Sequence, residues 1–219
     1  MRNILTKKIF TISIISLFFI QMLYLIMEPT VIIAATVTDN VIVTLNVTSG
    51  VTISNGVDTT MTPNIGVISD KSIASSSWNV ATNSATGYTL AVKASTTPAL
   101  KNGSVDSFAD YTEAVGGTPD PWGGVAVGTK EFGYSAYGTD TPTGTWGTAL
   151  DCGNVGTGIT NVAQKYRGLS TTDATIASRA SVTPNVGITT NICFAAQQNA
   201  IYAASGTYTA TITATATAA

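Results

Sequence analysis

Residues 205–219 read SGTYTATITATATAA, and from position 207 to position 218 threonine alternates with tyrosine, alanine or isoleucine. Successive side chains of a β-strand point to opposite faces, so this period of two predicts a strand with one apolar and one polar face. We expect the strand to close a β-sandwich and its last residues, 215–219, to extend beyond the sheet. The residues expected to face the core are Tyr208, Ala210, Ile212 and Ala214, and those expected to face solvent are Thr207, Thr209, Thr211 and Thr213.

The same alternation recurs along the chain and predicts further short strands. It places them at residues 41–47, 51–53, 78–80, 88–94, 174–182 and 187–196, and a helical turn is the alternative at residues 173–181. We interpret the strands at 78–80 and 88–94 as a hairpin, because the segment 83–87 between them ends on a glycine, which accepts a positive φ. No long segment with the helical period follows the first 35 residues. The predicted fold class is therefore all-β, an antiparallel β-sandwich of short strands.

Between residues 98 and 158 the alternation weakens, and glycine and proline become frequent, as is typical of loops. We expect Gly/Pro-rich mid-chain loops here. A short helix at residues 105–115 and two short strands within residues 125–138 fit the pattern. The stretch carries the aromatic residues Trp122, Phe132, Tyr134, Tyr137 and Trp146.

The first 35 residues have the order of a secretory signal peptide. A basic start at residues 2–8 precedes an apolar run over residues 9–26, and small residues follow up to Ala35. We predict that residues 1–35 are a signal peptide cleaved near Ala35 and that residues 36–219 form a single β-sandwich domain. The alternative is an uncleaved membrane anchor, because the apolar run is long for a signal core. In both cases the remainder of the chain lies outside the cytoplasm.

The charge balance limits the partners of the chain. It has 10 Lys and Arg residues, 12 Asp and Glu residues and no histidine. The predicted leader contains three of the basic residues and one acidic residue, which leaves 7 basic and 11 acidic residues. Without clustered basic residues, we expect binding neither to nucleic acid nor to anionic lipid. Charged residues make up 10% of the chain against about 25% in soluble domains, so Thr, Ser, Asn and Gly carry its solubility.

Both cysteines, Cys152 and Cys193, lie outside the leader. An even number of cysteines in an exported chain predicts a disulfide, which would close a loop of about 40 residues. The alternative is a pair of free thiols. Two cysteines without histidine offer too few ligands for zinc, and the chain has no calcium-loop motif, so we expect no metal and no cofactor.

The absence of histidine excludes Ser-His-Asp and Cys-His catalysis. A hydrolase would instead need a pair of carboxylates. The candidates are Asp106, Asp110, Glu113, Asp120 and Glu131. Their ordinary role is to solvate a surface that is poor in charge, and we expect a protein that is not an enzyme.

The mid-chain aromatic residues are the candidates for ligand binding. Trp122 and Trp146 each precede a glycine in predicted loops, and Tyr134 and Tyr137 lie between them. Aromatic faces on loops can stack on sugars or on partner proteins. The alternative is that these rings fill the ends of the sandwich. Trp78, which lies within a predicted strand, is expected to belong to the core.

Two segments carry a resemblance to a known family. Residues 75–95, SSSWNVATNSATGYTLAVKAS, and residues 205–213, SGTYTATIT, resemble the secreted cell-surface β-sandwich proteins of Gram-positive bacteria, of the WxL-domain type. Here the tryptophan strand reads Trp78-Asn79-Val80 in place of Trp-x-Leu. The resemblance implies attachment to the cell envelope without covalent sorting, often within complexes of extracellular proteins. It carries no functional residue over to this chain.

These features predict an exported structural or adhesive protein that is retained at the bacterial cell surface. A cell-envelope protein or polysaccharide would be its partner. The alternative function is a carbohydrate-binding module that uses the loop aromatics. Self-association by strand addition is a further expectation, because the uncharged strands at 41–47 and 208–219 contain no proline and present unprotected edges.

Overall fold

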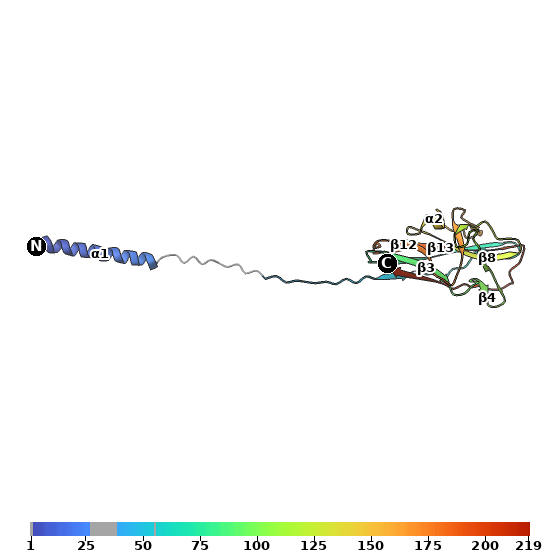
Figure 1. Cartoon of the computed structure of the whole chain (residues 1–219), viewed down its shortest axis with the longest axis horizontal. Helices are drawn as coiled ribbons and strands as arrows, with labels where there is room; N and C mark the ends of the chain where they lie inside the picture. The colour runs from blue at the N-terminus through green and yellow to red at the C-terminus, as the bar shows by residue number, and fades with distance from the viewer. Residues whose placement is uncertain (1, 27–38, 55) are drawn as a thin grey trace. The chain divides into compact units, whose positions relative to one another are not determined.

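A computed structural model describes residues 2–26, 39–54 and 56–219 of the chain (Figure 1). Helix α1 (Arg2–Ile26) contains the predicted apolar run. In these three ranges no helix is both long enough and apolar enough to cross a membrane. The predicted cleavage position near Ala35 lies outside the described residues, so cleavage stays a prediction.

The chain divides into two units, Met1–Asn46 and Val47–Ala219. The second unit is an antiparallel β-sandwich, as predicted, in which a large sheet packs against a small one. The small sheet has the order β12-β3-β14, made of Ala174–Arg179, Tyr88–Ala94 and Ile212–Ala218.

The large sheet has the order β1-β2-β13-β8-β11-β7, and β6 pairs in parallel with β8. Its strands are β1 (Val51–Ser54), β2 (Lys71–Thr82), β6 (Ala109–Asp110), β7 (Asp120–Pro121), β8 (Thr129–Gly138), β11 (Lys165–Gly168) and β13 (Ile188–Asn199). The remaining elements are β4 (Lys101–Asn102), β5 (Asp106–Ser107), α2 (Thr143–Trp146), β9 (Gly153–Asn154) and β10 (Ile159–Thr160).

The main core lies between the two sheets. It takes alternate residues of each long strand, because these share one face. Members include Ala74 and Val80 of β2, Leu90 and Val92 of β3, Phe132 and Tyr134 of β8, Ile176 of β12, and Ile192 and Phe194 of β13.

A second core lies on the opposite face of the large sheet. Cys193 and Ala195 of β13 point to this side and form a core with Tyr166 of β11 and with buried mid-chain residues that include Trp122 and Cys152. The mid-chain loops therefore act as a third layer that covers the outer face of β13.

The prediction of a strand at residues 41–47 is wrong for the single chain. Residues 39–50 have no regular secondary structure, and the side chains of Val41, Val43, Leu45 and Val47 are between 76% and 88% exposed. The alternation is present, but a strand also needs a hydrogen-bonded neighbour, and these residues pair with no strand of the described chain.

The predicted hairpin of β2 and β3 is also wrong. The two strands lie in different sheets, because β1 and β13 occupy both edges of β2 while β12 and β14 occupy both edges of β3. The segment between them passes from one sheet to the other. Gly87, with φ of 85°, supports the expected turn, and a Cβ there would lie 1.9 Å from the Arg179 carbonyl oxygen.

Three local predictions need correction. Residues 105–115 contain β5 and β6 rather than a helix, because Phe108 and Tyr111 turn inward to different cores. Two short strands were predicted within residues 125–138, but residues 129–138 form one continuous strand, β8, which Gly133 does not interrupt. Residues 215–218 do not overhang, because they pair with β3 as far as the Ala218–Tyr88 pair.

The disulfide prediction is confirmed. Cys152 and Cys193 form a disulfide with Cα atoms 5.4 Å apart, and both residues are buried in the second core. The bond joins a mid-chain loop to the centre of β13, so it holds the third layer on the large sheet.

We predict that replacing both cysteines, Cys152→Ala with Cys193→Ala, lowers the free energy of unfolding by about 3–4 kcal/mol. The reason is that the cross-link restricts a loop of about 40 residues in the unfolded chain. Urea unfolding followed by tryptophan fluorescence measures the difference. Wild-type protein that has been reduced and alkylated serves as the control, and an unchanged midpoint in both samples would contradict the prediction.

Candidate functional site

The structure places the two loop tryptophans in the cores, which corrects the ligand-stacking prediction. Trp146, at the end of α2, is 1% exposed and lies 5.3 Å from the ring of Tyr134, which is also 1% exposed. Trp122 is 9% exposed and stacks on Tyr111 at 4.5 Å, and its indole N–H donates to Gln197.

Tyr137 is half-buried beside the second core, and Trp78 is half-buried beside the main one. Trp78 therefore borders the core rather than lying within it. Because Trp122, Tyr134 and Trp146 have no free ring face, they offer no stacking surface for a sugar. The physical reason is that Trp122 lies in the packed layer of loops over the large sheet, whereas Tyr134 and Trp146 belong to the main core.

The five candidate carboxylates hold loops in place. Four of them accept backbone N–H bonds from other segments: Asp110 from Ala99, Glu113 from Gly168, Asp120 from Ala114 and Glu131 from Thr112. Burial raises the pKa of the Asp110 and Glu131 carboxyls. The described residues contain no group of His, Cys, Asp and Glu side chains that could hold a metal ion.

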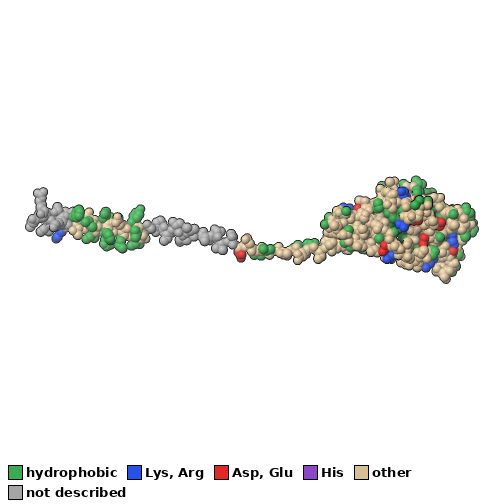
Figure 2. All heavy atoms as spheres, viewed as in Figure 1, with side chains coloured by type: hydrophobic (Ala, Val, Ile, Leu, Met, Phe, Trp, Pro, Cys, Tyr) green, Lys and Arg blue, Asp and Glu red, His purple; other side chains and the backbone are tan. Residues whose placement is uncertain are grey.

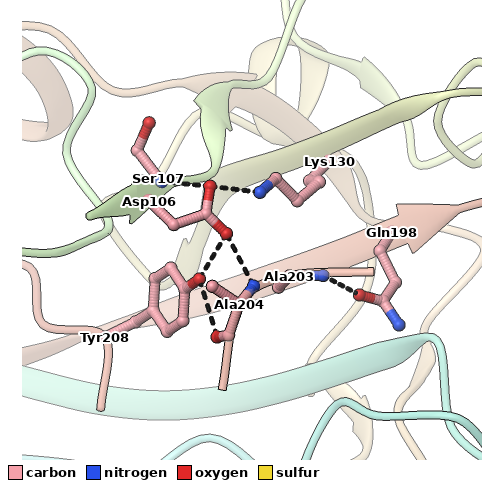
Figure 3. Close-up of polar contacts among 7 residues, drawn as sticks. All are labelled: Asp106, Ser107, Lys130, Gln198, Ala203, Ala204 and Tyr208. Carbon is pink, nitrogen blue, oxygen red and sulfur yellow. Dashed lines mark hydrogen bonds and ion pairs between the residues drawn. The ribbon is translucent and has the colours of Figure 1, made fainter. Parts of the chain in front are cut away.

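Asp106 makes the largest of these networks (Figure 3). One carboxylate oxygen accepts from the Lys130 ammonium and from the Ser107 N–H, and the other accepts from the Tyr208 hydroxyl at 2.5 Å and the Ala204 N–H at 2.8 Å. Asp106 thus joins β5 and β8 to the segment that leads into β14.

The contacts of this network shift the pKa of two of its groups. The Lys130 ammonium, the Tyr208 hydroxyl and the Ala204 N–H hold the pKa of the Asp106 carboxyl well below its usual range. Burial, followed by the hydrogen bond to Asp106, raises the pKa of Tyr208 to about 12. Asp106 is therefore ionised and Tyr208 neutral at neutral pH, the states in which their hydrogen bond is made.

Beyond this network, β14 forms an edge of the small sheet. The predicted alternation is confirmed: Tyr208 and Ala210, which precede the strand, and Ile212 and Ala214 within it pack against the main core, and the intervening threonines are exposed. Ala216, which was expected to overhang, packs against the main core as well. The inward side chains of β14 are only half-buried, however, and so is Val51 of the neighbouring edge strand β1. The sandwich is thus incompletely closed on this side. We call the outer backbone of β14, with these half-buried side chains, the β14 edge.

The hydrogen bonds show which backbone groups of β14 have no strand partner. Thr211 accepts from the Ser95 N–H, and the Ala219 N–H donates to the Gly87 oxygen, so the odd-numbered residues face β3. In an antiparallel ladder the bonding direction alternates along the strand. The N–H and C=O groups of Ile212, Ala214, Ala216 and Ala218 therefore point outward, away from β3.

The opposite edge of the small sheet is covered. The Ser178 N–H of β12 donates to the Asp140 oxygen at 3.0 Å, and Arg179 forms an ion pair with the Asp140 carboxylate at 3.1 Å. The inward residues Ile176 and Ala177 are fully buried. Charged groups and a loop thus protect β12, while β14 carries no charged residue.

Comparison with protein-family models, curated proteins and solved structures finds no match to this chain. The structure defines it as an antiparallel β-sandwich domain with one disulfide.

Sequence reasoning found the alternating face of β14 but missed the residues that position it. Lys130 and Tyr208 are far from Asp106 in sequence, and no local pattern links the three. The alternation also says nothing about which backbone groups of a strand remain unpaired, because that depends on its place in the sheet.

We predict that Trp146→Ala lowers the free energy of unfolding by about 3–5 kcal/mol, because it removes a buried aromatic side chain and leaves a cavity. Leu150→Ala is the matched control: this side chain is 82% exposed, so its loss should change stability by less than about 0.5 kcal/mol. Thermal unfolding followed by circular dichroism measures both. Equal stability of the two variants would show that Trp146 does not support the core.

We predict that Asp106→Asn destabilises the domain at neutral pH and that the difference shrinks as the pH falls. The folded-state pKa of Asp106 is lowered, so its contribution is fully present above the ordinary aspartate pKa of about 3.9. That contribution is lost as the pH drops towards the folded-state value. Urea unfolding at pH 7, 4 and 2.5 measures the trend.

The control for this pH series is Asp173→Asn. Asp173 forms an exposed ion pair with Lys93, and such pairs contribute little to stability. A constant difference between wild type and Asp106→Asn across the three pH values would refute the role assigned to the ionised carboxylate.

Proposed function

We propose that this chain is an exported, non-enzymatic structural or adhesive component of the bacterial cell surface. The observation that carries the proposal is the buried Cys152–Cys193 disulfide, which joins two layers of the domain. Disulfides persist in oxidising compartments and are rare in the cytosol. The order of the first 35 residues, with its basic start and apolar run, supports export independently.

The surface chemistry supports a structural role. Figure 2 shows one face of the β-sandwich on which charged side chains are sparse and uncharged polar groups and backbone dominate. The acidic residues considered for catalysis, Asp106 among them, each accept hydrogen bonds that hold loops in place. These hydrogen bonds give each of the acidic residues a structural role, so none of them requires a catalytic role to explain its position. The resemblance of residues 75–95 and 205–213 to WxL-type surface proteins points to the same location.

The proposal is tested by locating the full chain in a bacterium that expresses it. We expect the protein in the cell-envelope fraction, accessible to protease added to intact cells, with Cys152 and Cys193 resistant to a thiol reagent until they are reduced. Mass spectrometry should show loss of a leader ending near Ala35. A cytoplasmic protein with two reactive thiols would overturn the proposal.

A further inference from the structure

We propose that copies of this chain join by strand addition, in which residues 41–47 of one copy pair along the β14 edge of another copy. Strand addition occurs where an extended segment completes the edge of a sheet and inserts alternate side chains into the core of its partner. The inference goes beyond the proposed function and does not depend on where the protein is located.

The donor segment has the pattern of a half-buried strand without any sheet to bury it. Residues 41–47 read VIVTLNV, so Val41, Val43, Leu45 and Val47 fall on one face of an extended chain. All four are more than three-quarters exposed. Exposed apolar residues in a row mark a surface that gains free energy when it is covered.

The β14 edge matches this donor in length and in volume. The donor and β14 each have seven residues, and the four outward-pointing residues of β14, which include Ile212 and Ala214, supply backbone groups for one added ladder. Three of these four are alanines, whose small side chains leave the inner face of β14 only half-buried. The larger Val and Leu side chains of the donor would cover it.

The distribution of charged residues permits the donor segment to pair with β14 and disfavours its pairing with β12, the other edge of the small sheet. Neither residues 41–47 nor β14 carries a charged residue, so adding the donor to β14 buries no unpaired charge. At β12 the loop at Asp140 and the Arg179 ion pair already occupy the edge. The β14 edge is therefore the acceptor.

The donor is better placed for a second copy than for its own domain. To run along its own β14, the chain would have to reverse direction within residues 48–50 before entering β1. Asn83 holds these residues: its side chain donates to the Thr48 oxygen at 2.9 Å and accepts from the Gly50 N–H at 2.7 Å. A reversal would have to take place at this clamped point.

Two variants of the full chain test the donor. Leu45→Asp places a charge on the inserted face, whereas Thr44→Asp places the same charge on the opposite face of the same segment. Association of each, in mild detergent, is measured by sedimentation velocity over a concentration series. We expect Thr44→Asp to assemble like wild type and Leu45→Asp to associate at least about tenfold more weakly. Association through α1 would be equal in both variants.

A third variant blocks the acceptor. Ala216→Pro removes an outward-pointing N–H and leaves the bonds from β14 to β3 intact, and proline is tolerated in an edge strand of this kind. It should fold but not assemble. Ala218→Pro, which removes another outward N–H, is the substitute if Ala216→Pro fails to fold as judged by circular dichroism.

Mixing the donor variant with the acceptor variant tests whether the two surfaces pair with each other. Leu45→Asp retains a working acceptor and Ala216→Pro a working donor, so the two should form one-to-one dimers with each other and nothing larger. The proposal is overturned if Leu45→Asp assembles as well as Thr44→Asp, if the mixture does not associate, or if wild type stays monomeric at all concentrations. A monomeric wild type whose melting temperature falls on Leu45→Asp substitution would place the donor on its own β14 instead.

Discussion

Strand β13 is the constraint on which the rest of the structure depends. It lies at the centre of the large sheet, with β2 and β8 on its two edges, and both its faces are apolar. Ile192 and Phe194 face the main core, while Cys193 and Ala195 face the second core. A strand that is buried on both faces needs a layer on each side, and two sheets alone supply only one. The mid-chain loops supply the other.

This requirement explains why the mid-chain loops form a buried layer on the large sheet. Segments rich in glycine and proline have little regular structure, so their backbone groups must be satisfied by other means. Asp110 and Asp120 each accept one such N–H group, Glu113 accepts the N–H of Gly168 in β11, and the disulfide fixes the layer covalently. The few acidic residues are thus largely used inside the fold, which leaves a surface of uncharged polar groups.

The sequence was sufficient to predict faces but not partners. Alternation identified the inward residues of β14, because which residues of a strand share a face depends on local spacing. It could not show that β2 and β3 lie in different sheets, since pairing depends on which edges distant strands have already taken. The aromatic loops were ambiguous for the same reason. Whether Trp122 is buried or exposed depends on the third layer, and no local sequence pattern predicts a layer built from loops.

Residues 41–47 also show that alternation alone does not provide a strand with a partner. Their alternation resembles that of β14 except at Ile42, which is also apolar, yet only β14 forms a strand, because β3 offers it an edge. An alternating apolar pattern predicts a strand with one buried face. Within the described chain, no residue buries the apolar face of residues 41–47. The β14 edge has the complementary deficiency: its outward backbone groups pair with no strand of the described chain, and its inward alanines are only half-buried. Each of the two lacks what the other supplies, a sheet edge for residues 41–47 and an added strand for β14, and this complementarity is the basis for proposing that a second copy of the chain pairs the two.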